Sequence, residues 1–328
     1  MTARAFADRK KQIPRALFLR RFLPLGGVLF CMALFLRDPA LAAGAVTDGL
    51  RLTAQKLIPA VFPFLVLSDL LVVCGGVPAW ATRPAQYVFR LPTAGAQAVL
   101  LGWLCGFPIG AQCAVRAMEE RTLTREEAER TVAISSVPSP AFLLGAVGSG
   151  LFGDRRYGLF LEGSVLFAAA LSGVILARFT HDRSARSEKK TVDSRQAGPF
   201  AGQLTAAVRK AALTTLNLAA FVVFFSAVSG AAGAILTRLG AGEPLRAAVN
   251  GLLELSGGAA RAAALPDARL ARLLCAGAAG WGGVSVHFQI ASVCAGQDLR
   301  LRRYLFAKGL QCLLCLFFTT LFLLISGR

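Results

Sequence analysis

The chain is dominated by apolar stretches long enough to cross a lipid bilayer as helices. A helix needs roughly 20 mostly apolar residues to span the hydrocarbon core, and the sequence offers about nine such stretches. Only 16% of the residues are charged, whereas soluble domains carry about 25%. Too few polar side chains remain to cover a water-facing surface, so we expect lipid to cover much of it. The sequence therefore predicts an all-α polytopic membrane protein with about 8–9 hydrophobic segments.

The first apolar stretch, Phe22–Leu36, follows a basic N-terminal segment over residues 1–21. It is either a retained span or a signal peptide, for which Ala40-Leu41-Ala42 resembles a cleavage site. The basic segment is long for a signal, which favours the span, and both interpretations place the N-terminus in the cytoplasm. The later segments are Leu57–Val77, Ala96–Met118, Ala128–Phe152, Tyr157–Phe179, Gln203–Thr237, Leu245–Leu265, Leu270–Gly296 and Tyr304–Ile325.

A polar, basic linker over residues 180–202 divides the chain into a first half, 22–179, and a second half, 203–328. Each half has a long apolar helix, two segments broken by glycine or proline, and a closing apolar helix. Broken segments at corresponding positions of two halves are a strong sequence indication of a transporter binding site. The four breaks are Gly106–Gly110, Ser136–Pro140, Ser256–Gly258 and Gly280–Gly283.

The net charge of +18 comes from basic residues at the N-terminus and between the apolar stretches. The positive-inside rule explains this distribution better than nucleic-acid binding does. The N-terminus and the linker both belong in the cytoplasm, so one earlier segment should fail to cross, and Ala96–Met118 suits a re-entrant hairpin. If Leu270–Gly296 does likewise, 28 of the 36 basic residues lie on the cytoplasmic side.

The breaks of the first half are candidate substrate-lining segments. Non-helical backbone at membrane depth is tolerated only where it is buried in protein or lines a wet cavity, and the ends of half-helices suit anions. Helix packing is the alternative, since Gly102, Gly106 and Gly110 form consecutive small-xxx-small steps. The candidates are Gly106, Pro108, Gly110, Ser136, Pro138 and Ser139.

Ionisable residues inside apolar stretches are costly and usually face a pathway. Glu254 is the strongest candidate for proton coupling or substrate contact, and a structural pairing with another helix is its alternative. Asp69 is a second coupling candidate, with an interfacial position as its alternative. His287 is a hydrogen-bonded packing residue or part of the site. The second-half binding candidates are Glu254, Ser256, Gly257, Gly282, Ser285, His287 and Gln289.

No enzyme motif is present in the sequence. It has no phosphate-binding glycine loop with lysine, no paired zinc-binding histidines and no GxSxG elbow, and only two histidines in all. The eight cysteines lie in or beside apolar stretches and form neither a disulfide framework nor a metal pattern. We expect no enzyme activity, no cofactor and no metal, and we leave open whether the chain associates with further copies of itself.

At its breaks the chain resembles the YlbJ/SpoVV family of sporulation integral membrane proteins. The resemblance runs from about Leu57 to about Val293 and rests on Pro59-Ala60-Val61-Phe62-Pro63-Phe64, Gly106-Phe107-Pro108-Ile109-Gly110-Ala111, Ser139-Pro140-Ala141-Phe142, Glu254-Leu255-Ser256-Gly257-Gly258 and Trp281-Gly282-Gly283-Val284-Ser285-Val286-His287-Phe288-Gln289. The family belongs with the nucleoside-recognition gate proteins, whose wider relatives include ferrous iron transporter B and concentrative nucleoside transporters.

The resemblance implies a role in spore formation, with dipicolinic acid moved across the outer forespore membrane. In other cells the same protein would sit in the cytoplasmic membrane. Two classes of function follow from the sequence: a transporter of a small, anionic or nucleoside-like solute, and a non-transporting scaffold or assembly factor of the sporulating envelope. A polar cavity between the two halves favours the first, whereas tight apolar packing throughout favours the second.

Overall fold

The computed structural model describes residues 15–73, 77–179 and 200–326, and every regular element in these ranges is a helix. The N-terminal segment before Arg15 and most of the predicted linker lie outside the described residues. The helices are α1 (Arg15–Arg37), α2 (Pro39–Leu52), η1 (Thr53–Leu57), α3 (Ile58–Val73), α4 (Ala79–Phe89), α5 (Thr93–Cys105), α6 (Ile109–Glu119), α7 (Arg125–Ser135), η2 (Ala141–Leu151), α8 (Arg155–Arg178), α9 (Phe200–Arg238), α10 (Glu243–Leu253), α11 (Leu255–Ala263), α12 (Ala268–Trp281), α13 (Gly283–Val293) and α14 (Arg302–Ser326).

Three of the described helices, α8, α9 and α14, are long and apolar enough to cross a membrane unaided. Two bent pairs bring the number of spans by length and composition to as many as five. Many large apolar side chains on α1, α9 and α14 face outward, as lipid contact requires. The expected all-α polytopic membrane fold is confirmed.

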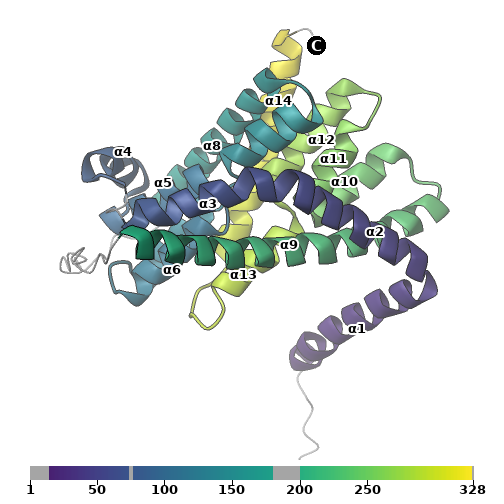
Figure 1. Cartoon of the computed structure of the whole chain (residues 1–328), viewed down its shortest axis with the longest axis horizontal. Helices are drawn as coiled ribbons and strands as arrows, with labels where there is room; N and C mark the ends of the chain where they lie inside the picture. Colours follow the sequence, from purple (N-terminus) through teal and green to yellow (C-terminus); the bar gives the residue numbers. More distant parts are fainter. Residues whose placement is uncertain (1–14, 74–76, 180–199, 327–328) are drawn as a thin grey trace, which may run out of the picture.

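The N-terminal helices form an arm beside the rest of the protein. α1 stands away from the other helices and is bent by 103° from the helix that follows it (Figure 1). Asp38 starts that next helix by accepting a hydrogen bond from the Leu41 N–H at 3.1 Å, a standard N-cap arrangement. From Pro39 to Val73 the chain stays helical through α2, η1 and α3, so the segment expected to begin at Leu57 begins 18 residues earlier. α2 and α3 both pack along α9.

Two helical hairpins, α5–α6 and α10–α11, occupy corresponding places in the two halves. Glycines let the arms of each hairpin touch. A Cβ on Gly110 would lie 2.9 Å from the Cα of Gly102, and a Cβ on Gly258 would lie 2.2 Å from the Cα of Gly251. Because real Cβ atoms do not come this close to backbone, both hairpins depend on glycine at the contact. Gly102 and Gly110 therefore have the packing role that their small-xxx-small spacing indicated.

A broken helix follows each hairpin: α7–η2 in the first half and α12–α13 in the second. Each runs from one end of the protein to the other. At one end Arg303, at the start of α14, binds Glu126 and Glu129 of α7 at 2.6 and 2.8 Å. At the other end Arg272 of α12 binds Asp154, which follows η2, at 3.3 Å. α12 and α14 lie antiparallel, with Gly277 against Leu316 and Gly280 against Cys312.

This arrangement corrects the expected topology of the second half. Leu270–Gly296 is the broken helix that passes from end to end, and Leu245–Leu265 is the hairpin. The error arose because both segments are apolar and glycine-broken, and only the long-range pairing of Arg272 with Asp154 distinguishes them. Moving the basic residues near Arg272 to the other side leaves 25 of the 36 basic residues in the predicted cytoplasmic groups, so the positive-inside bias persists.

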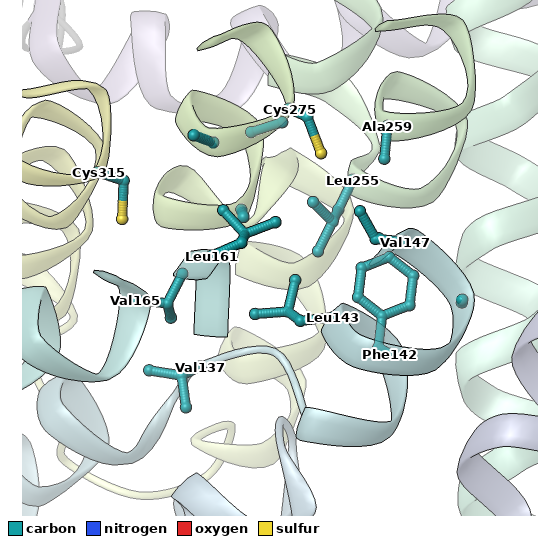
Figure 2. Close-up of a cluster of buried hydrophobic side chains, with 14 of the residues drawn as sticks. Val137, Phe142, Leu143, Val147, Leu161, Val165, Leu255, Ala259, Cys275 and Cys315 are labelled. Carbon is teal, nitrogen blue, oxygen red and sulfur yellow. The ribbon is translucent and has the colours of Figure 1, made fainter. Parts of the chain in front are cut away.

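The largest buried apolar cluster joins the two halves. Figure 2 shows Val137, Phe142 and Leu161 of the first half beside Leu255, Ala259 and Cys275 of the second. These residues come from the break before η2, from η2 itself, from α8, and from α11 and α12. The two hairpins and two broken helices are thus held around one core, which fixes the relative positions of the four breaks.

Candidate substrate cavity

Broken segments of both halves meet at a narrow cavity that is partly open to the outside. Its polar lining consists of Ser139 from the first half and Glu254, Ser256 and Gln289 from the second. Its apolar walls include two aromatic rings, Phe107 and Phe142, and the α9 residues Leu218 and Val222. Segments separated by more than 100 residues therefore build one site that combines apolar surface with a few polar groups, as small-molecule sites do.

The two first-half breaks contact each other directly. The N–H of Phe107, in the turn between α5 and α6, donates to the carbonyl of Val137 at 2.9 Å. Gly106 has a positive φ of 78°, and a Cβ there would lie 2.6 Å from the backbone nitrogen of Ser139. Only glycine suits that position. The hairpin turn thereby holds Pro138 and Ser139 against the cavity, while Pro108 and Gly110 do not line it.

Glu254 sits at the turn of the second hairpin and is only 2% exposed. Its backbone is extended, and its carboxylate accepts hydrogen bonds from the N–H groups of Ser256, at 2.8 Å, and Gly257. It therefore caps the N-terminus of α11, where a negative group is favourable. Among the described residues no basic side chain forms a salt bridge with it. The N-terminus of α11, which would otherwise suit an anion, thus already holds a carboxylate of the chain itself.

The remaining candidates of the second half lie away from the cavity lining. His287 shares a hydrogen bond of 2.8 Å with the Tyr304 hydroxyl and packs edge-on against Trp281, which matches its packing interpretation. Gly282 has a positive φ of 91° and adjoins the Lys308 side chain. Ser285 is buried, and its hydroxyl has no hydrogen-bond partner in the part of the chain that the structure describes.

Asp69 also lies outside the lining. It forms a salt bridge with Lys210, which joins α3 to α9. The Lys210 side chain is 57% exposed, so the pair sits at the surface of this helix contact. The geometry corresponds to the interfacial alternative for Asp69.

The sequence analysis did not single out Lys308 and Gln311, which are both 0% exposed. The Lys308 ammonium donates to the carbonyl of Ser136 at 3.2 Å and to the side-chain oxygen of Gln311 at 2.9 Å. Lys308 escaped notice because it lies only four residues after Tyr304, where a lysine at the start of an apolar helix ordinarily reaches water. The sequence signal that could have identified Lys308 was its position inside the apolar segment Tyr304–Ile325.

A comparison with curated protein sequences finds a relative of the chain. Over 320 aligned residues the chain is 22% identical to the sporulation integral membrane protein YlbJ of Bacillus subtilis (strain 168), covering 86% of this chain and 78% of the relative. No family model matches the chain, and no solved structure matches it. The similarity agrees with the resemblance that the break motifs indicated, and it supports a YlbJ-like family of integral membrane proteins for this chain.

Proposed function

We propose that this protein is a membrane transporter, not an enzyme, and that its substrate binds in the cavity between the two halves. The observation that carries the proposal is the meeting of four broken segments around a cavity with polar groups from both halves. Transporters built from repeats place their binding sites at such discontinuous helices. A scaffold has no use for a polar cavity at the junction of its two halves. On this proposal the lipid bilayer is the environment of the protein, and nucleic acid is not a partner.

We propose a small aromatic carboxylate, dipicolinate, as the substrate, in keeping with the sporulation role in the name of the relative. Phe107 and Phe142 offer faces for a flat ring, and Ser139, Ser256 and Gln289 offer hydrogen bonds. A dianion next to an ionised Glu254 would be repelled at short range. Transport of this substrate therefore needs Glu254 to take up a proton. The movement of dipicolinate is thereby coupled to the movement of a proton. The membrane would be the outer forespore membrane in a sporulating cell and the cytoplasmic membrane otherwise.

A nucleoside-like solute is the second candidate. No lysine, arginine or histidine is among the residues that line the cavity in the described part of the chain. A neutral ring with hydroxyl groups would need no cation and could donate hydrogen bonds to the Glu254 carboxylate. The lack of positive charge in the lining thus favours a nucleoside-like solute, whereas the sporulation role in the name of the relative favours dipicolinate.

Uptake into proteoliposomes tests both candidates. We expect labelled dipicolinate to accumulate when a proton gradient is imposed, and labelled uridine to accumulate if the second candidate is correct. Ser256→Ala should reduce uptake because it removes a hydroxyl from the lining. The matched control is Ser149→Ala, since the Ser149 hydroxyl donates to the carbonyl of Leu144 at 3.0 Å and lies outside the cavity. The proposal that the protein is a transporter would be refuted by two results together. The proteoliposomes would take up neither dipicolinate nor uridine, and a deletion strain would show normal spore assembly and normal dipicolinate content.

A further inference from the structure

A lysine buried among oxygen atoms lies at the break of the first broken helix, where α7 ends. Lys308, on α14, is completely buried, and its ammonium contacts the carbonyl oxygen of Ser136 and the amide oxygen of Gln311. Across the described ranges no carboxylate lies within salt-bridge distance of it. An isolated buried charge is costly, so the oxygens around Lys308 must carry the stabilisation that a counter-ion would otherwise provide.

The Ser136 carbonyl belongs to the C-terminal end of α7, and Gln311 of α14 binds the same helix end. Gln311, also completely buried, donates to the carbonyl of Ala133 at 3.3 Å and to the hydroxyl of Ser172 at 3.1 Å. The last carbonyls of a helix have no donors within the helix and carry a partial negative charge. Lys308 and Gln311 thus satisfy two carbonyls at this helix end, those of Ser136 and Ala133, and the Ser172 hydroxyl of α8 accepts a further hydrogen bond from Gln311.

The second broken helix reaches the same lysine. A Cβ added to Gly282, at the break between α12 and α13, would lie 3.5 Å from Cε and 3.8 Å from Nζ of Lys308. The ammonium thus sits between the break of α7–η2 and the break of α12–α13. In transporters with broken helices, unwound carbonyls and the C-terminal ends of half-helices are the groups that coordinate a free alkali cation.

We propose that the Lys308 ammonium is a tethered cation that takes the place of a free alkali cation at the end of α7. The side chain supplies one positive charge to the Ser136 carbonyl oxygen and the Gln311 amide oxygen, which would otherwise bind a metal ion such as Na⁺. The protein therefore needs no sodium to hold its two broken helices together. This role in the folded state is independent of the proposed transport, and its consequence that uptake is sodium-independent rests on that proposed function.

The test removes the tether and asks whether a free cation replaces it. Purified Lys308→Ala is unfolded by heat in NaCl, in methylammonium chloride and in choline chloride at equal ionic strength. We expect a lower melting temperature than wild type in choline, and an upward shift in NaCl or methylammonium, because these cations fit the vacated space and choline does not. The wild-type melting temperature should be the same in all three salts. Lys56→Ala is the control, since it removes an exposed lysine of η1 and should gain no cation-specific shift.

Uptake gives a second measurement on the same proteins. Wild-type uptake should be unchanged when Na⁺ is replaced by choline, whereas Lys308→Ala should lose most of its uptake in choline and regain it in Na⁺ or methylammonium. If wild type transports neither solute, the melting data still decide the role of Lys308, so the two proposals fail separately. If Lys308→Ala cannot be purified folded, Lys308→Ser prepared in methylammonium replaces it. A sodium requirement in wild type, or a variant whose melting temperature ignores the cation, would overturn the proposal.

Discussion

Two carboxylates in the membrane-embedded part of the chain differ in their surroundings. Glu254 accepts two backbone hydrogen bonds at the start of α11. Glu162 of α8 is 8% exposed, and neither of its carboxylate oxygens has a hydrogen-bond partner within the described ranges. An unsatisfied buried polar group costs stability, whereas a capping group adds to it. The same side-chain chemistry thus has opposite energetic consequences at these two positions.

Replacing Glu254 should separate its capping role from its role in transport. Glu254→Gln keeps one oxygen for the N–H of Ser256 or Gly257, so we expect a loss of about 1 kcal/mol or less in the free energy of unfolding. Uptake should nearly vanish, because the amide cannot carry a proton. Glu254→Ala leaves both donors unpaired and should cost about 2 kcal/mol. Thermal melting and uptake measured side by side check this, and wild-type uptake by Glu254→Gln would exclude proton coupling at this residue.

Replacing Glu162 should have the opposite effect on stability. Glu162→Gln removes a charge that has no partner, so we expect the variant to be as stable as wild type, or more stable by about 1 kcal/mol. Melting of the purified variant is the measurement. A clear drop in melting temperature would contradict the expectation, because it would mean that the Glu162 charge has a stabilising partner.

The hairpins owe their shape to glycines at the contact between their arms. At Gly258 the opposing atoms are backbone atoms of Gly251, which cannot move aside without opening the hairpin. The turn of this hairpin carries Glu254 and Ser256 into the cavity. The spacing of two helical arms therefore controls the position of the polar lining.

Adding one methyl group at this contact should disturb both stability and uptake. Gly258→Ala forces the α10 and α11 backbones apart, and we expect a cost of about 1–3 kcal/mol, as in other overpacked sites. Gly163→Ala on α8 is the control, because nothing lies within 4 Å of the added carbon, and alanine should stabilise a helix by roughly 0.5–1 kcal/mol. Equal melting temperatures for the two variants would contradict the close contact between the arms.

The whole molecule has two ends, each marked by ion pairs between an arginine and carboxylates. Glu126 and Glu129 with Arg303 mark one end, and Asp154 with Arg272 marks the other. Since each broken helix joins the two ends and each hairpin returns to the end where it began, the hairpins enter from opposite sides. From the distribution of basic residues we predict that the Arg303 end faces the cytoplasm.

Labelling of single cysteines in sealed cells tests this orientation. In a variant without native cysteines, Ala268→Cys, near Arg272, should react with a membrane-impermeant reagent added from outside. Ser187→Cys, in the linker, should react only after the membrane is opened. Outside labelling at Ser187, or protection at Ala268, would reverse or refute the topology.

The amino-acid sequence by itself was sufficient for the class of protein, for three of the four break positions and for the likeness to YlbJ. The break predicted at Ser256–Gly258 lies instead at Glu254, and those three residues belong to α11. These depend on local chemistry: apolar runs of membrane length, and glycines and prolines that interrupt them. Only the tertiary structure decided which segment of the second half is a hairpin, which break residues face the cavity, and that Lys308 is buried. In a helix that is apolar on all sides, the pattern of residues does not say which side faces protein and which faces lipid. Contacts such as Lys308 to Ser136 and Arg272 to Asp154 join residues more than 100 positions apart, so packing of the complete chain determines them.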